Sequence, residues 1–241
     1  MNIFISNKLT EPEYAEGKVN ELLDDNDRVT YSDDLHLAVS LRSFRAETLS
    51  SFVHSLLDFN PDASNLYKDV SSKGYPVMLT RDIDKARAWL RSKSRGSEQT
   101  GILVSKVAAR FKPQAVNVLA QGDENAVHWF LEDKTDIRSS NYLEEAATEI
   151  QVQGLELDYV CVLWDADMMC SNHKWNYFKF NGKTNWNPEK NPESRKYMLN
   201  AYRVLLTRAR QGVVICVPDG NSRKNSEGFP EDATRLPEFY D

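Results

Sequence analysis

The stretch Thr148-Glu149-Ile150-Gln151-Val152-Gln153-Gly154-Leu155-Glu156 decides how the rest of this chain is interpreted. Residues 148–151 are expected to form a strand that ends in a turn at Gly154, with the carboxylate of Glu156 just beyond. A glycine between a strand and a helix permits a tight turn and lets a ligand approach the backbone closely. The first amide groups of that helix would then point toward an anion. The stretch therefore predicts an anion-facing corner of an α/β fold, with an ordinary strand-loop-helix corner as the alternative.

A second stretch, Leu205-Leu206-Thr207-Arg208-Ala209-Arg210, is expected at the end of a helix that Gly212 terminates. A guanidinium in that position is always charged and offers a planar fork of donors to phosphate oxygens. The alternative is a cationic last turn that complements the helix dipole. We favour the phosphate contact for Arg208 and the dipole for Arg210.

The remaining apolar pattern alternates between strands and helices, which is typical of an α/β fold. Residues 159–164 show no polar alternation, as in a parallel strand that is covered on both faces. Strands are expected at 75–80, 101–105, 159–164 and 213–217. Helices are expected at 46–58, from the cap Asp82 to about 94, after 105 to about 109, at 126–131, and from Pro192 to about 210.

An aromatic-rich stretch interrupts this pattern at about 170–191. It holds Asn181-Gly182, a strong signal for a two-residue hairpin turn. We therefore expect a β-hairpin inserted into the sheet order. Its aromatic side chains could stack on bases, at ~1–3 kcal/mol each, but we favour the interpretation that they form the core of the insertion.

Charge is distributed unevenly along the chain. The net charge of −6, taken alone, disfavours a nucleic-acid binder. Residues 81–112, however, hold nine basic and three acidic side chains, whereas residues 1–36 hold three basic and nine acidic ones. A basic segment in an acidic chain is compatible with a phosphate-facing surface, and equally with a solvated helix face.

The chain shows no sign of secretion or of membrane insertion. Its first residues lack the pattern of a signal peptide, and no apolar run approaches the ~20 residues that a membrane helix needs. Cys161, Cys170 and Cys216 form no CxxC pair, and two of them lie in apolar runs. Buried free thiols fit a reducing compartment, so we expect a cytoplasmic protein without a membrane partner.

The two stretches quoted above resemble the fifth and sixth motifs of superfamily 1 DNA and RNA helicases, and they occur in the same order. The resemblance implies that Arg208 acts as an arginine finger on the γ-phosphate of ATP. It also implies that Glu156 contacts the nucleotide sugar, beside Gln153 and Gly154. The residue that matches Thr148 lies near the phosphates of single-stranded nucleic acid in these enzymes.

Residues 37–45 resemble the fourth motif, whose arginine also approaches the γ-phosphate. Arg42 is the better match and Arg45 the alternative. Ile150 departs from the fifth motif, because some members have His there, so no base contact is carried over. The subgroup that this chain resembles most is that of the Schlafen-like helicase domains of unknown function, in which an aromatic hairpin like 175–186 also occurs.

The resemblance implies a RecA-like C-terminal helicase lobe over residues 35–218. Its fold class is α/β, with a mostly parallel sheet, helices on both faces and the inserted β-hairpin. We expect an acidic N-terminal edge segment at 1–34, partly helical at about 14–23, and a polar tail at 219–241.

The chain has no GxxxxGK[ST] loop to cradle the β- and γ-phosphates, and no Asp-Glu pair placed to hold Mg²⁺. We therefore expect ATP with Mg²⁺ to bind only together with an N-terminal RecA-like lobe, in the same protein or in a separate chain. We favour a fragment of a larger protein that is inactive alone.

Two other functions stay open. One is a non-catalytic nucleic-acid or protein-binding module that keeps the fold without turnover. The other is a metal-dependent nuclease that uses Asp165 and Asp167, which follow the central strand where ligands often bind. The sequence leaves the choice between DNA and RNA open.

Overall fold

The computed structural model describes residues 2–7, 28–35, 44–108, 110–120, 123–181 and 185–228. The chain divides into two compact units, Met1–Phe44 and Arg45–Asp241. In the first unit, strands β1 (Ile3–Ile5) and β2 (Val29–Tyr31) pair in parallel, and the short 3-10 helix η3 (Asp33–Leu35) follows. The helix expected at 14–23 and the residue Arg42 lie outside the described residues.

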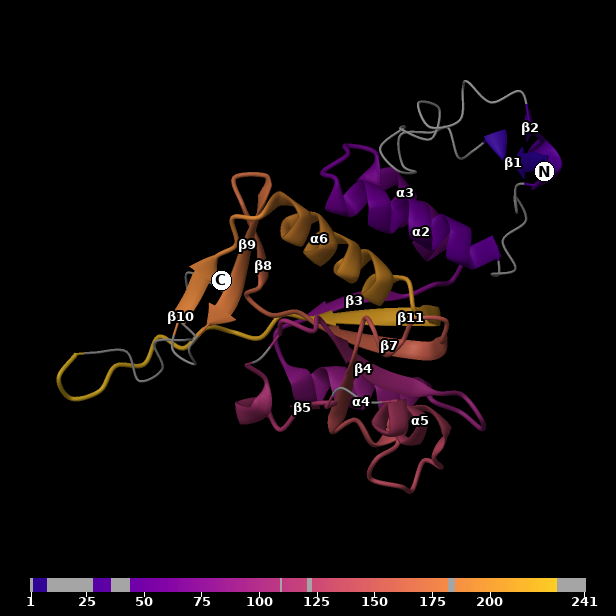
Figure 1. Cartoon of the computed structure of the whole chain (residues 1–241). Coiled ribbons are helices and arrows are strands. Elements are labelled where there is room, and N and C mark those ends of the chain that lie inside the picture. The colour runs from indigo at the N-terminus through magenta and orange to yellow at the C-terminus, as the bar shows by residue number, and fades with distance from the viewer. Residues whose placement is uncertain are drawn as a thin grey trace. The chain divides into compact units, whose positions relative to one another are not determined.

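A six-stranded parallel sheet organises the second unit, in the order β3-β11-β7-β4-β6-β5 (Figure 1). Its strands are β3 (Val77–Thr80), β4 (Thr100–Val104), β5 (Asn117–Val118), β6 (Glu145–Thr148), β7 (Leu157–Leu163) and β11 (Ala209–Cys216). Because all pairings are parallel, the sheet has one edge of carboxyl ends and one of amino ends. The predicted α/β class with a mostly parallel sheet is confirmed.

Helices cover both faces of this sheet, as the alternation of side chains on β7 demonstrates. Val160 and Val162 pack in one hydrophobic core, and Cys161 and Leu163 pack in the other. Helices α2 (Phe44–Leu57), α3 (Ala63–Ser72) and α6 (Pro192–Leu206) contribute to the first core, and α4 (Ile83–Lys93) contributes to the second (Figure 1). The lack of polar alternation in β7 therefore has its predicted cause, burial on both faces.

The helix starts follow from their capping residues. The side chain of Asp82 accepts hydrogen bonds from the amides of Asp84 at 2.9 Å and Lys85 at 3.2 Å, which caps α4. The side chain of Asn191 caps α6 by accepting a hydrogen bond from the amide of Glu193 at 2.9 Å, and Pro192 occupies the first helical position. Both predicted starts are confirmed.

The predicted end of α6 is wrong. The helix stops at Leu206, and β11 begins at Ala209, so Gly212 lies inside a strand. A Cβ atom on Gly212 would lie 2.7 Å from Cγ of Pro76, so the glycine is needed for close strand packing and does not end the helix.

Three further local predictions also need correction. The strand expected at 148–151 lies earlier, because β6 ends at Thr148 and residues 149–154 form turns. Residues 106–107 form a turn where a short helix was expected. Helix α3 was not predicted; only Val70 on it is buried, so its apolar signal is weak. Helix α5 (Asp123–Leu131) appears where a helix was expected.

The aromatic stretch forms a three-stranded antiparallel sheet rather than a lone hairpin. Strands β8 (Met168–Ser171), β9 (Lys174–Asn181) and β10 (Asn185–Pro188) pair in the order β10-β9-β8. The turn between β8 and β9 has Asn172 and His173 at φ values of 53° and 55°, as a tight hairpin requires. This first hairpin was not predicted.

The aromatic side chains of this insertion are used for packing. The rings of Phe180 and Trp186 meet edge to face at 5.1 Å between centroids, and Trp186 is buried. The indole of Trp175 stacks on Trp164 and donates a hydrogen bond to the carbonyl of Leu57 at 2.6 Å. The preferred interpretation of these residues as a packing core fits this arrangement.

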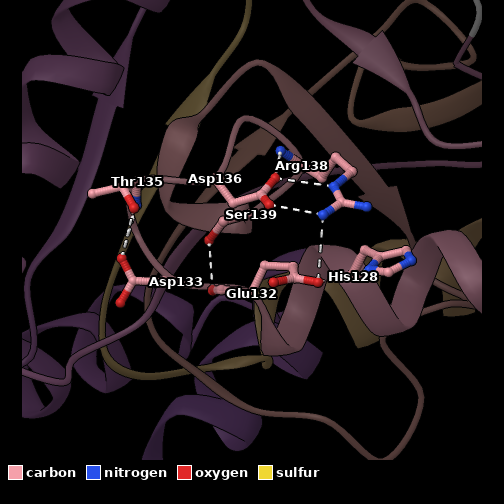
Figure 2. Close-up of polar contacts among 7 residues, drawn as sticks. All are labelled: His128, Glu132, Asp133, Thr135, Asp136, Arg138 and Ser139. Atoms are coloured by element: carbon pink, nitrogen blue, oxygen red, sulfur yellow. Dashed lines mark hydrogen bonds and ion pairs between the residues drawn. The ribbon is translucent and has the colours of Figure 1, made fainter.

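The loop after α5 is braced by its own polar groups (Figure 2). The guanidinium of Arg138 donates to both carboxylate oxygens of Asp136, at 3.0 and 2.8 Å, and the hydroxyl of Ser139 donates to the carbonyl of Glu132. The side chain of Asn141 then accepts a hydrogen bond from the amide of Thr100 at 3.0 Å. The loop therefore fixes the amino end of β4.

Two findings concern the environment of the protein. Among the residues that the structure describes, no helix is long and apolar enough to cross a bilayer. All three cysteines are free, with Cys161 and Cys216 buried and Cys170 exposed, as the apolar runs predict for two of them.

Replacement of Asn191 by alanine tests the capping of α6. We expect Asn191→Ala to lower the free energy of unfolding by about 1 kcal/mol, the usual cost of a lost N-cap, measured by urea denaturation. The matched control is Asn225→Ala, because Asn225 makes a similar side-chain bond to the amide of Glu227 without a helix behind it. Equal effects of the two substitutions would contradict the capping role.

Candidate functional site

The segment between β6 and β7, residues 149–156, crosses the sheet from one edge to the other, and we call it the crossover segment. Thr148 ends β6 at the carboxyl edge, and Leu157 begins β7 at the amino edge. The segment starts with a helical turn, in which the amide of Val152 donates to the carbonyl of Thr148 at 3.1 Å. The two ends of the quoted motif therefore lie at opposite edges of the sheet.

Gly154 makes the last turn of the crossover segment. Its φ of +79° lies in the left-handed region that favours glycine, but open space surrounds the position of a Cβ atom. A strand follows this glycine, so the prediction that helix-start amides would face an anion here is wrong. The requirement for glycine comes from the backbone conformation.

Arg208 fastens the crossover segment at the amino edge. Its Nη1 donates to the carbonyls of Val152 at 3.5 Å and Leu155 at 3.4 Å, and its Nε donates to the carbonyl of Val204 at 3.2 Å. The residue is only 8% exposed. These distances exceed the ~2.7–2.9 Å of charge-assisted hydrogen bonds, as expected for neutral carbonyl acceptors.

The structure brings the predicted nucleotide residues together around this arginine. The amide of Leu157 donates to the carbonyl of Arg208 at 3.1 Å, which places Glu156 directly beside the start of β11. Gln153 and Gly154 are exposed, and Glu156 is half-buried. Glu156 and Arg208 therefore lie at the same edge of the sheet.

Arg210 has a different role from the predicted one. It belongs to β11 rather than to a helix end, and its Nη2 donates to Asp158 Oδ1 at 2.9 Å. The same carboxylate oxygen accepts from Gln211, and the other oxygen accepts from the amide of Gln99 at 2.9 Å. The helix-dipole interpretation is wrong because α6 ends before this residue.

These contacts control the ionisation of Asp158. Burial raises its pKa, but the hydrogen bonds from the Gln99 amide, from Gln211 and from Arg210 outweigh burial and hold the pKa below its ordinary value. The ionised carboxylate therefore joins β7 and β11 to the residues that precede β4, which makes the amino edge rigid.

Thr148, the predicted nucleic-acid contact, lies at the carboxyl edge. It is 8% exposed, and its amide and hydroxyl lie 2.9 and 3.1 Å from Oε1 of Gln151. The side-chain amide of Gln151 in turn donates to the carbonyl of Ala120 at 3.1 Å. Arg42, the second predicted phosphate contact, falls outside the described residues.

Glu149 was missed by the sequence analysis. It is 2% exposed, and its Oε2 accepts a hydrogen bond from the amide of Lys106 at 2.8 Å. The only signal in the sequence is a carboxylate placed directly after the buried strand β6. Its burial singles it out, because ionisable side chains are rarely buried without partners.

Asp165 and Asp167 also lie at the carboxyl edge, but both are buried, at 2% and 0% exposure. The hydroxyl of Tyr202 donates to Asp167 at 2.6 Å. No group of three or more potential metal ligands occurs among the described residues. Burial and the tyrosine contact disfavour the nuclease interpretation.

The comparisons with known proteins give one result. A model of the family described as Schlafen group 3, DNA/RNA helicase domain, matches residues 8–219, which is most of the chain. No curated protein and no solved structure has a significant match.

The ionisation of Asp167 makes stability depend on pH. Burial, and then the neighbouring Asp165, raise its pKa to about 7, against weaker opposing effects of hydrogen bonds from Tyr202 and Ser105. The folded chain therefore retains a proton that the unfolded chain loses near pH 4, and the stability from that proton disappears as pH rises toward 7. We expect the unfolding free energy to fall over this range by a few kcal/mol at most, since one pKa unit is about 1.4 kcal/mol.

Asp167→Asn isolates this contribution. The variant should show a flatter stability profile between about pH 4 and 7 than the wild-type chain, measured by thermal unfolding. Asp69→Asn, at an exposed position of α3, should leave the profile unchanged. A wild-type slope that persists in Asp167→Asn would assign the effect to another group.

Proposed function

Because this chain belongs to the Schlafen group 3 family of DNA/RNA helicase domains, we propose that it forms the C-terminal RecA-like lobe of an ATP-dependent helicase motor. The parallel sheet with helices on both faces supports this role. A second, N-terminal RecA-like lobe, in the same protein or in another chain, would supply the phosphate-binding loop that this sequence lacks. The two buried thiols, Cys161 and Cys216, support a cytoplasmic location as part of the same proposal.

The amino edge of the sheet is the proposed nucleotide side. Glu156 would contact the sugar, with Gln153 and Gly154 beside it, and Arg208 and Arg42 would contact the γ-phosphate. The exposure of Gln153 and Gly154 supports this assignment. ATP, when bound with Mg²⁺, supplies the phosphoryl group, and the ligands of the ion would come from the other lobe.

Arg208 carries the proposal. Its guanidinium donates to main-chain carbonyls at 3.2–3.5 Å. Charged phosphate oxygens form shorter and stronger bonds with a guanidinium than neutral carbonyls do. Exchange of the Val152 and Leu155 carbonyls for phosphate would therefore be favourable, and it would release the crossover segment from its clasp.

The crossover segment would connect the nucleotide to the nucleic acid. One end of the segment is held by Arg208, and the other end follows Thr148, which we propose as a contact of single-stranded DNA or RNA. A displacement of the crossover segment at the amino edge would then also move the residues that follow Thr148 at the carboxyl edge. Such gating is a general use of binding energy in enzymes that close around a ligand.

The burial of Arg208 favours one rival function. At 8% exposure, the arginine can serve as a permanent clamp of the crossover segment. The chain would then be a non-catalytic nucleic-acid or protein-binding module that keeps the fold without turnover. Kinetic experiments separate the two functions.

We expect no ATP hydrolysis by this chain alone, and turnover when it is joined to a lobe with a phosphate-binding loop. In the joined protein, Arg208→Lys should lower kcat on the order of 10³-fold or more, with a small change in nucleotide affinity. Lysine keeps the charge but loses the planar fork. The matched control is Arg210→Lys, because Arg210 makes an ion pair with Asp158 instead.

Two outcomes would contradict the motor. Measurable turnover by the isolated chain that Arg208→Ala abolishes would place the whole site here. Equal losses of kcat and of nucleotide affinity in Arg208→Lys would assign the arginine to ground-state binding or to structure.

Single-strand binding is the second expectation. The chain should bind single-stranded DNA or RNA with an affinity whose logarithm falls linearly with the logarithm of salt concentration, as phosphate contacts require. Fluorescence anisotropy between 50 and 200 mM salt measures the slope, and a duplex of the same sequence is the control. Absence of binding at the lowest salt would remove the nucleic-acid part of the proposal.

A further inference from the structure

A pocket of about 300 Å³ lies at the carboxyl edge of the central sheet, and we call it the carboxyl-edge pocket. It is bounded by the residues after β4, by Glu149 after β6, by Lys179 of β9 and by α6 between Glu193 and Ala201. Ligands of open α/β sheets bind at this edge, and the volume suits a small planar group. Arg208 and Glu156 lie at the opposite edge, so this pocket is separate from the proposed nucleotide side.

One carboxylate oxygen in this pocket lacks a partner. Glu149 is 2% exposed, and the amide of Lys106 satisfies its Oε2 at 2.8 Å. Its Oε1 is buried and has no hydrogen-bond partner among the described residues. A buried acceptor without a donor costs free energy of folding. Glu149 therefore marks a position where a ligand can donate a hydrogen bond.

The walls of the pocket are mostly apolar. Val107, Met198 and Ala201 line it, and the ring of Tyr197 stands at its rim with 42% exposure. The ammonium of Lys106 lies 4.0 Å from the centre of the Tyr197 ring. The carboxyl-edge pocket therefore combines an aromatic ring, apolar walls and the hydrogen-bond acceptor of Glu149 that has no partner among the described residues.

The charges at the mouth restrict the ligand further. Lys106 and Lys179 both line the pocket, and Lys179 pairs with Glu189. Glu149 and Glu193 also line the pocket, so two basic and two acidic side chains balance in charge and fit a neutral ligand. A neutral planar group can donate a hydrogen bond to Glu149, and the two ammonium groups can contact a phosphate beside it.

We propose that the carboxyl-edge pocket takes one unpaired nucleobase with an exocyclic amino group, as in cytosine, adenine or guanine. The inference rests on the proposed function, which brings a single strand to Thr148, the residue next to Glu149. A carboxylate accepts from such an amino group, and an unstacked base can lie against an aromatic ring such as Tyr197. Thymine and uracil flank their only ring N–H with carbonyl oxygens, which a carboxylate repels.

This pocket gives the lobe a preference among bases. Contacts to the phosphates of a strand are indifferent to sequence, whereas Glu149 discriminates by hydrogen-bond donors. A strand rich in amino-bearing bases is held more tightly than one of thymine or uracil. The sugar makes no difference to this contact, so the preference holds for DNA and RNA alike.

The test measures binding of the full chain to labelled homopolymers of equal length by fluorescence anisotropy. Oligo-dC, oligo-dA and oligo-rC should bind on the order of tenfold more tightly than oligo-dT and oligo-rU, a typical discrimination for a polar base contact. Glu149→Gln should abolish this preference, because an amide can also donate to carbonyl oxygens. Its own carbonyl can still accept from the Lys106 amide, which preserves the local structure.

Two further variants keep the test decisive. Glu193→Gln removes an exposed carboxylate at the mouth of the pocket and should change binding to all strands equally. Ser194→Phe fills the half-buried mouth without touching Glu149, and it should abolish the preference even if Glu149→Gln fails to fold.

The outcomes separate this inference from the proposed function. Equal binding of all homopolymers by the wild-type chain overturns the base pocket and leaves the strand contact of the lobe in place. A preference that survives both Glu149→Gln and Ser194→Phe also overturns it. Absence of binding to every strand, together with binding of an arginine-rich peptide that Glu149→Gln weakens, overturns the pocket and the strand contact together.

Discussion

The clasp between Arg208 and the crossover segment joins the start of β11 to the connection between β6 and β7. A parallel sheet separates carboxyl ends from amino ends, so the chain must travel the full height of the sheet between β6 and β7. The segment that does so contains a single helical turn and a left-handed glycine, and two of its backbone carbonyls, those of Val152 and Leu155, accept from the guanidinium of Arg208. Val152 also anchors the segment in the first hydrophobic core, whereas Gln153 and Gly154 are exposed.

The two edges that this segment joins differ in their chemistry. Asp158 gathers hydrogen bonds from Gln99, Arg210 and Gln211 at the amino edge, which holds three neighbouring elements in register. The carboxyl edge instead contains buried carboxylates with oxygens that have no partner among the described residues, on Glu149 and Asp167. A rigid edge suits a phosphate contact, and an edge with unpaired acceptors suits a ligand that brings donors.

Local signals predicted several of the elements, and contacts between distant residues determined where other features lie. The caps Asp82 and Asn191-Pro192 and the unbroken apolar pattern of β7 are encoded within a few residues, and the structure follows them. The prediction for Gly212 was wrong because the need for glycine comes from contact with Pro76, which precedes the neighbouring strand β3. The partners of Arg208 could not be predicted either. They are backbone carbonyls, which every residue has, so the sequence does not indicate which of them accept a hydrogen bond. Motif order did indicate that this arginine and Glu156 belong to one edge.

The three cysteines divide into two inert thiols and one accessible thiol. Burial raises the pKa of Cys161 well above its ordinary value and that of Cys216 to about 12, so neither forms the reactive thiolate at neutral pH. Cys170 is exposed on β8. The native chain therefore carries a single attachment point for a maleimide dye or spin label, on the antiparallel insertion, and its distance to a labelled strand can be followed without engineering the protein.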